Sequence, residues 1–182
     1  FHDCGTHAIK MSAAKIHTIG AGNTFTMGSG YGIYVYSDAV AGTITWKNLN
    51  VPYYFNGETD IDNATLTIEP GTIFKFDING GLYFGWAGST TLFANGTSTM
   101  PIVFTSNASA PTAGAWKGLY FYEHNLQNTS MTYCDINYAG KTNEQAIELS
   151  YTKLTFSNNI VHNSAGLVIK AYGESSFVAM QS

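Results

Sequence analysis

A tetrapeptide that returns along the chain is the feature that most limits what this sequence can fold into. Gly-Leu-Tyr-Phe occurs at residues 81–84 and again at 118–121, and Gly-Ile-Tyr-Val at 32–35 is a third version. In each copy an aliphatic residue, a tyrosine and a further apolar residue follow the glycine. This period of two is typical of an extended strand with one buried face.

The returning strand belongs to a repeat of three short strand-like segments. The first segment lies at residues 8–11, 32–35, 52–55, 81–84, 118–121, 146–149 and 166–169. The second lies at 15–19, 43–46, 65–68, 90–93, 130–133 and 153–156, and the third at 23–27, 48–51, 71–76, 101–106, 134–138 and 158–162. We therefore predict an all-β fold, a parallel β-solenoid of about six coils with three short strands per coil.

Composition agrees with short strands and frequent turns in one domain over residues 1–182. The chain is 45% hydrophobic and 11% charged, and it contains 19 glycines. Such a chain is apolar enough to bury a core, and its Gly, Thr, Asn and Ser content suits strands and turns. Residues 7–17 are rich in alanine and come nearest to a helix, but we interpret them as two strands because 8–11 fits the repeat.

Several longer runs carry a resemblance to a known family. They are Ala-Thr-Leu-Thr-Ile-Glu-Pro-Gly-Thr-Ile-Phe-Lys-Phe at 64–76, the segments at 80–84 and 92–106, Ala-Trp-Lys-Gly-Leu-Tyr-Phe at 115–121, and Asn-Tyr-Ala-Gly at 137–140. Their order over roughly residues 40 to 170 resembles the right-handed parallel β-helix repeats of many secreted and cell-surface bacterial proteins. The resemblance implies a right-handed coil and an extracellular or cell-surface location. It leaves activity open, because this fold hosts lyases, hydrolases, adhesins and inert spacers.

Charge and missing motifs exclude several classes of function. The chain has no arginine, eight lysines and a net charge of −4, which argues against nucleic-acid binding. No apolar run approaches the ~20 residues that span a membrane, so we expect no membrane insertion. Pectate-lyase-like enzymes that resemble this fold use an arginine or lysine base with calcium-binding carboxylates, and galacturonan hydrolases use clustered aspartates in Asn-Thr-Asp, Asp-Asp and His-Gly motifs. The arginine and these motifs are missing, so we expect no catalytic centre.

The expected role is therefore that of a structural or adhesive rod that binds glycan or protein, or that assembles with copies of itself. The alternative is a segment of a polysaccharide-degrading lyase or hydrolase whose active site lies elsewhere in a longer chain. A second alternative comes from Thr43 and Thr45, which we expect to lie over Thr65 and Thr67. This pattern resembles the threonine arrays of ice-binding solenoids, although β-propensity explains it equally simply.

Tyrosines form the candidate binding surface. If the apolar residues of the first strand point inward, its tyrosines point outward and lie one above another at ~4.8 Å steps. The expected column consists of Tyr34, Tyr54, Tyr83 and Tyr120, flanked by Tyr36 and Tyr122. Such a column could be a stacking platform for sugars or a contact for another protein, or its rings could simply stack across strands and stabilise the sheet.

An acidic run offers the only candidate for a metal site that we retain, and no other cofactor is expected. Glu58, Asp60 and Asp62 occupy alternate positions, so an extended backbone puts their carboxylates on one face. Carboxylate oxygens are the ligands that calcium prefers. The alternative is a solvated loop, which we favour because the glycine-punctuated pattern of calcium loops is not matched.

The ends of the chain and its two cysteines give two further expectations. We place Cys4 and Cys134 in the same strand of coils that lie about 24 Å apart, too far for an intrachain disulfide. Neither end of the sequence carries an amphipathic helix or a charged closing loop, so both ends of the rod are expected to lack caps. We therefore expect a fragment of a longer solenoid, or a subunit that stacks end to end with copies of itself.

Overall fold

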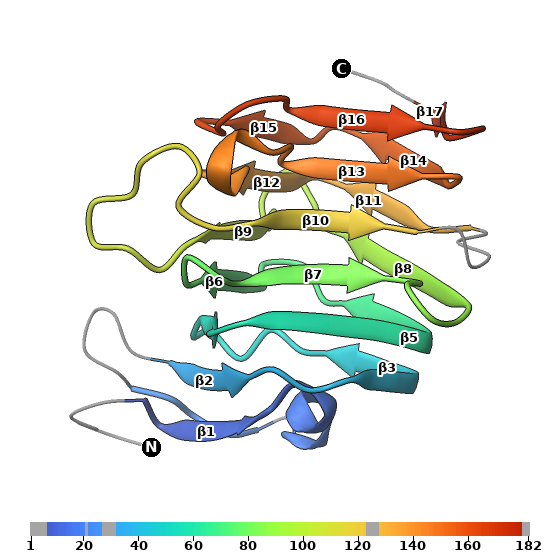
Figure 1. Cartoon of the computed structure of the whole chain (residues 1–182). Coiled ribbons are helices and arrows are strands. Elements are labelled where there is room, and N and C mark those ends of the chain that lie inside the picture. Colours follow the sequence, from blue (N-terminus) through green and yellow to red (C-terminus); the bar gives the residue numbers. More distant parts are fainter. Residues whose placement is uncertain (1–6, 21, 27–31, 123–127, 180–182) are drawn as a thin grey trace.

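The chain forms a right-handed parallel β-helix, as the sequence predicted (Figure 1). The computed structural model describes residues 7–20, 22–26, 32–122 and 128–179. In Figure 1 the strands nearest the viewer run from left to right and those behind run back, while the chain climbs from β1 at one end to β16 and β17 at the other. All strand pairs between coils are parallel, which is what a solenoid of stacked coils requires.

The strands lie on three faces of the rod, and most coils contribute to all three. The front face contains the first half of β5 (Glu58–Ile68), then β7 (Gly81–Phe84), β10 (Gly118–Phe121), β13 (Ile147–Ser150) and β16 (Ile169–Tyr172). The side face contains β3 (Val40–Trp46), the second half of β5, β8 (Thr90–Asn95), β11 (Ser130–Thr132), β14 (Lys153–Ser157) and β17 (Ser176–Ala179). The back face contains β1 (Ile9–Ser12), β2 (Ile33–Tyr36), β4 (Tyr53–Phe55), β6 (Ile73–Phe76), β9 (Ile102–Ser106), β12 (Cys134–Asn137) and β15 (Ile160–His162).

The interior is a column of apolar side chains that stack from coil to coil. Phe84 lies on Phe121 with ring centroids 4.8 Å apart, and Phe76 lies on Trp116 at 4.3 Å. Register places Leu82 over Leu119, and both are fully buried, as the alternation in the tetrapeptide predicted. The fold is stabilised by this shared column because no single coil can bury its own apolar half.

Corners between faces use residues in the left-handed backbone region. Asn63 (φ 52°) turns β5 from the front face to the side face, and Tyr151 (φ 52°) does so between β13 and β14. Tyr133 (φ 49°) forms the corner between β11 and β12. One residue at positive φ redirects the chain in a short space, and asparagine adopts this region more readily than most residues.

Glycine opens the repeated tetrapeptide because neighbouring coils pass close to it. A Cβ atom on Gly118 would lie 2.5 Å from the carbonyl oxygen of Ala146, and one on Gly32 would lie 2.1 Å from that of Pro52. Gly118 also has φ 142°, a conformation that side chains rarely allow. The backbone of the next coil therefore fixes the identity of these two residues.

The predicted assignment of strands to faces is wrong for the early coils. Segments 32–35 and 52–55 lie on the back face as β2 and β4, and β4 pairs with β6 rather than with a front strand. All three faces alternate apolar and polar residues, so the pattern within a tetrapeptide cannot tell which face it occupies. The predicted second strands 43–46, 65–68, 90–93, 130–133 and 153–156 do share the side face. The last three lie within two residues of their observed bounds, whereas β3 and β5 begin three and seven residues earlier than predicted.

Four of the five residues of the predicted strand 15–19 are helical rather than extended. The 3₁₀ helix η1 (Ala13–Thr18) buries Ala13 and Ile16 against the first coils, where a side-face strand was expected. The alanine-rich composition had favoured helix locally, and here that preference prevails. A second 3₁₀ turn, η2 (Lys141–Asn143), precedes β13. None of the described helices is long and apolar enough to cross a membrane.

Candidate functional site

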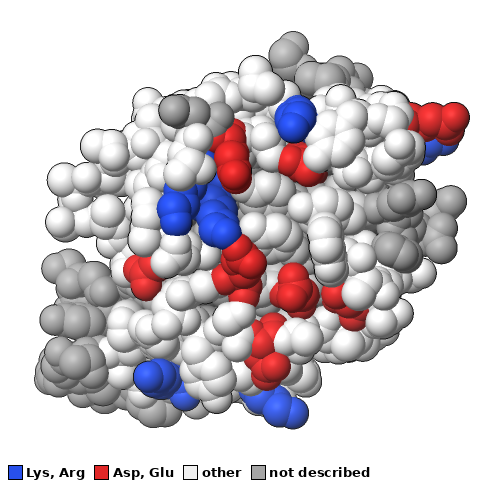
Figure 2. Space-filling model, in the orientation of Figure 1, with Lys and Arg blue, Asp and Glu red and all other residues white. Residues whose placement is uncertain are grey.

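The front face carries a group of aromatic and charged side chains at outward positions. One outward column runs through five strands in strict register, from β5 to β16, and consists of Asp60, Tyr83, Tyr120, Glu148 and Lys170. Figure 2, which views this side of the molecule, shows acidic side chains gathered across it with fewer lysines among them. We give the name front cluster to this column together with the residues beside it, which are Glu58, Asp62, Trp86, Lys117, Tyr122, Glu144 and Tyr172.

Tyr83 and Tyr120 stack on each other, so the ring faces that they turn toward each other are not available to a ligand. Their ring centroids are 4.6 Å apart and their planes differ by 9°. Tyr120 is buried, and its hydroxyl donates to Glu144 Oε2 at 3.2 Å. These two rings present edges and hydroxyls rather than open faces, so the geometry favours the cross-strand stacking role over a flat sugar platform at this pair.

The other predicted tyrosines do not form one column with this pair. Tyr34 and Tyr54 lie in register with each other on the back face, where Lys10 and Lys75 lie over their rings at 5.0 and 5.3 Å. Tyr36 ends β2 on the same face. The predicted six-tyrosine surface is therefore two groups in different sheets, because 32–35 and 52–55 belong to the sheet of β6, β9 and β12 rather than to that of β7 and β10.

Trp86 is the aromatic residue that the sequence interpretation missed. It follows β7, its side chain is 61% exposed, and it meets Tyr122 edge to face at a centroid distance of 4.8 Å. The next residue, Ala87, donates its backbone N–H to Asp62 Oδ1 at 3.0 Å, which ties this turn to β5. A tryptophan between glycines at the end of a strand was the available signal, because turn residues are exposed.

Most carboxylates of the front cluster have protein partners. Glu58 forms a salt bridge with Lys117. Glu148 is buried and accepts hydrogen bonds from Gln145 Nε2 and from the Tyr172 hydroxyl. These contacts hold the carboxylates in fixed positions on the face, and they lower the cost of burying Glu148.

Burial and neighbouring carboxylates together raise the pKa values of two groups in the front cluster. Desolvation, then Asp62 and then Glu58, raise the pKa of Asp60 above its usual value. The pKa of Tyr122 rises to about 12, first by desolvation and then by the charges of Glu148, Glu144, Glu58 and Asp60. Both shifts have the sign that crowded carboxylates produce, since each further negative charge becomes harder to form.

The predicted calcium ligands are extended, but they do not converge. Glu58 and Asp60 lie on the same side of β5, as the alternation required, yet Glu58 pairs with Lys117 and Asp62 accepts from Ala87. Among the described residues, no three His, Cys, Asp or Glu side chains are grouped so that they could hold a metal ion. Calcium binding here stays a prediction that the observed arrangement does not strengthen.

On the side face the threonine register is as predicted, but the array is short. Thr43 lies beside Thr65, and Thr45 beside Thr67, across β3 and β5. The next strand continues the first row with a threonine and places Phe93 in the second row. Ice-binding arrays need regular rows over several coils, so ice binding stays a prediction without added support.

Comparison with known proteins gives a family. A family model described as a pectate-lyase like beta helix domain matches residues 38–167, from just before β3 to just before β16. The matched stretch includes the described residues of the front cluster from Glu58 to Glu148, Trp86 among them. No curated protein and no solved structure matches the chain significantly.

Proposed function

The chain belongs to the family of pectate-lyase-like beta helix domains, and from this premise we propose that it is a non-catalytic, extracellular rod that binds glycan across its front face. The family match supports the β-helix and leaves the activity open, because one scaffold carries enzymes, adhesins and spacers. The front cluster supplies the binding surface in this proposal, and the stacked coils supply the rigid support beneath it.

One observation carries the proposal, namely the exposed Trp86 ring beside Tyr122 and the front carboxylates. A tryptophan that holds most of its area in solvent while it meets a second aromatic ring edge to face is fixed in place at little entropic cost. Its exposed ring surface can pack against the apolar face of a pyranose, while Asp60 lies within the same cluster to accept hydrogen bonds from hydroxyls. Tyr122 in turn lies parallel to the ring of Tyr83, at a centroid distance of 6.4 Å, and so joins this surface to the stacked pair of Tyr83 and Tyr120.

The negative charge of the front face favours sugars without carboxylates as ligands. The front carboxylates surround Tyr122, and the lysines that reach the face are engaged, Lys117 by Glu58 and Lys170 by the ring of Tyr172 at 4.9 Å. A polyuronate would bring like charges against this face and lose affinity. The proposed ligand is thus a neutral or amine-bearing glycan, unlike the acidic polysaccharides that enzymes resembling this fold degrade.

Binding titrations on Trp86→Ala test the proposal. After a glycan array identifies a ligand, isothermal titration should show about a tenfold loss of affinity, the effect of removing one aromatic contact of ~1.4 kcal/mol. Stability should change by less than about 0.5 kcal/mol because the side chain is exposed. Tyr36→Ala on the back face is the matched control and should bind normally. Equal affinity of Trp86→Ala and the parent protein would remove the front cluster from consideration.

A polysaccharide-degrading role is the second candidate, and the raised pKa of Asp60 is the observation that favours it. A carboxyl group of this kind can act as a general acid when a second carboxylate stands near it. The test is release of reducing or unsaturated ends from neutral and acidic polysaccharides by the parent protein and by Asp60→Asn. If the parent protein releases such ends and Asp60→Asn does not, the function of this face is catalysis rather than binding.

A further inference from the structure

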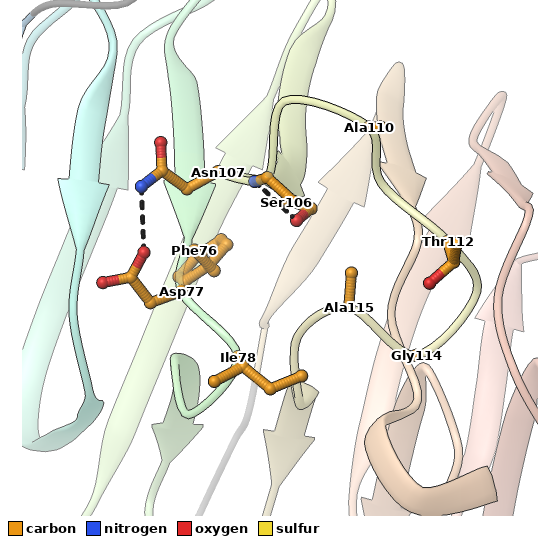
Figure 3. Close-up of a pocket in the computed structure, with 10 residues that line it drawn as sticks. Phe76, Asp77, Ile78, Ser106, Asn107, Ala110, Thr112, Gly114 and Ala115 are labelled. Atoms are coloured by element: carbon orange, nitrogen blue, oxygen red, sulfur yellow. Dashed lines mark hydrogen bonds between the residues drawn. The ribbon is translucent and has the colours of Figure 1, made fainter.

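A hollow at the other end of β7 from Trp86 lies apart from the front cluster. It occupies about 390 Å³ between the β6–β7 turn and the long β9–β10 loop (Figure 3). This volume falls in the ~300–1,000 Å³ range of small-molecule sites. Backbone hydrogen bonds fix the return of the loop, from Gly114 to Ala139 at 3.1 Å and from Lys117 to Gly80 at 2.9 Å. The wall on the loop side is therefore part of the folded structure.

Polar groups from two separate segments meet at the hollow. Asn107 Nδ2 donates to Asp77 Oδ1 at 2.9 Å, and this bond joins the turn to the loop. The bond orients both side chains and leaves the second carboxylate oxygen of Asp77 and the amide oxygen of Asn107 as acceptors. Thr112 adds a hydroxyl from the opposite side (Figure 3). These groups can accept from, and donate to, several hydroxyls of one ligand.

Apolar surface forms the remainder of the wall. Phe76 is fully buried beneath the hollow and is itself backed by Trp116, whereas Ile78 is 51% exposed and faces the loop side, which Ala110 and Ala115 line. An exposed isoleucine opposite alanines provides apolar contact surface. Polar acceptors beside apolar surface match the two sides of a pyranose ring, which carries hydroxyls at its rim and C–H groups on its face.

Charge at the hollow selects a neutral ligand. Among the described residues that line it, Asp77 is the one that carries a charge, so phosphate, sulfate or uronate would meet the negative charge of its carboxylate. Lys141 reaches the same turn, but its Nζ donates to Asn79 Oδ1 and it does not line the hollow. We propose that this hollow is a second binding site, separate from the front cluster, and that it takes one neutral sugar residue.

The position of the hollow would allow one glycan to occupy both sites. Trp86 follows the carboxyl end of β7, and the turn that forms the hollow precedes the amino end of the same strand. A glycan that crosses the front face along β7 can reach both ends. Two weak contacts on one chain then bind far more tightly together than either does alone.

The test uses the whole protein labelled with nitrogen-15 and neutral probes, namely methyl β-glucoside, methyl β-galactoside and N-acetylglucosamine, with galacturonate as the charged control. Neutral probes should shift the backbone amide signals of Asn107, Gly114 and Ala115, and galacturonate should not. Ala110→Trp, a change at an exposed loop position, should fill the hollow and abolish these shifts. Asp77→Asn should weaken binding about tenfold, the loss expected for one charged hydrogen bond.

The same titrations on Trp86→Ala separate the two sites. If the hollow is an independent site, its shifts persist in that variant even when the front cluster has lost its ligand. Absence of hollow shifts with every neutral probe overturns the inference, and so do equal shifts with galacturonate. Should Ala110→Trp fold poorly by circular dichroism, the Asp77→Asn affinity decides alone. Shifts confined to residues around Trp86 would support the proposed function and reject the second site.

Discussion

At the scale of single residues, burial of the Cys134 thiol should make the protein less stable as the pH becomes alkaline. Desolvation first raises the pKa of Cys134 to about 12, and a hydrogen bond with the backbone of Thr132 lowers it in part. A thiol with a raised folded pKa contributes its full stability below its unfolded pKa of about 9 and loses that contribution as pH rises towards 12. We expect the free energy of unfolding to fall by up to ~1.4 kcal/mol per pH unit in that window from this group.

Urea unfolding between about pH 8 and pH 11 measures this effect, and Cys134→Ala is the control that removes the thiol. The raised pKa values of Tyr122 and the stacked tyrosines also make stability fall as pH rises. The free energy of unfolding of the variant should therefore still decrease with pH, but less steeply than that of the parent protein. A parent protein whose stability stays flat over that range would contradict the burial of the thiol. Cys4 lies outside the described residues, so the absence of a disulfide between Cys4 and Cys134 stays a prediction, while Cys134 is a free thiol in the structure.

Sequence alone predicted which residues point inward, but not which are exposed enough to bind. Alternation assigned Leu82 and Phe84 to the core, and both are fully buried. It could not find Trp86, because exposure of a turn residue depends on which loops lie beside it. It also could not see that Tyr120 is covered, since that depends on Tyr83 and on the chain before β13.

At the scale of elements, the stack between β7 and β10 is a stabilising contact that a substitution can measure. Tyr120→Ala removes a buried ring, its stacking on Tyr83 and its hydrogen bond to Glu144. We expect a loss of about 3 kcal/mol in the free energy of unfolding, and about 1 kcal/mol for Tyr120→Phe, which keeps the ring. Chemical denaturation gives both values. Tyr36→Ala, at an exposed position, should cost less than about 0.5 kcal/mol.

The same experiment distinguishes a structural role from a binding role for these rings. If Tyr120→Ala unfolds more easily but keeps its glycan affinity once folded, the stack serves the sheet alone. A stable variant with lost affinity would instead return Tyr120 to the binding surface, against its burial.

Face assignment was the element-scale property that the sequence could not supply. The early copies 32–35 and 52–55 have the same alternation as the front-face copies, because every face buries one side of its strands. What separates them is the path of the corners, which is set by residues such as Asn63 at positive φ. Left-handed corners leave only a weak signal in sequence, since asparagine is also common in ordinary turns.

At the scale of the whole molecule, the two ends of the described rod differ. At the amino-terminal side the 3₁₀ helix η1 lies against β3 and buries Ile16, and the expected absence of a cap at that end stays a prediction. At the other side, within the described residues, β15, β16 and β17 each pair with a single neighbouring strand. Ile160, Leu167 and Val168 are 61%, 59% and 45% exposed there.

We propose that this last described coil is covered by another copy of the 182-residue chain in solution. Open strand edges beside exposed aliphatic side chains are a surface that solenoids normally cover. A head-to-tail contact of this kind extends into filaments unless its rotation closes a ring. We therefore expect the weight-average mass from light scattering to rise with protein concentration, and electron microscopy to show rods longer than one segment.

Placing charge on this end tests the contact. The double variant Ile160→Lys with Leu167→Lys should remain a monomer over the same concentrations, because each added ammonium would have to be desolvated in the contact. Ile78→Lys, which adds one charge at an exposed site beside the long loop, is the matched control and should associate like the parent. A parent protein that stays monodisperse and monomeric throughout would refute end-to-end association, and association that survives the double variant would move the contact to another surface.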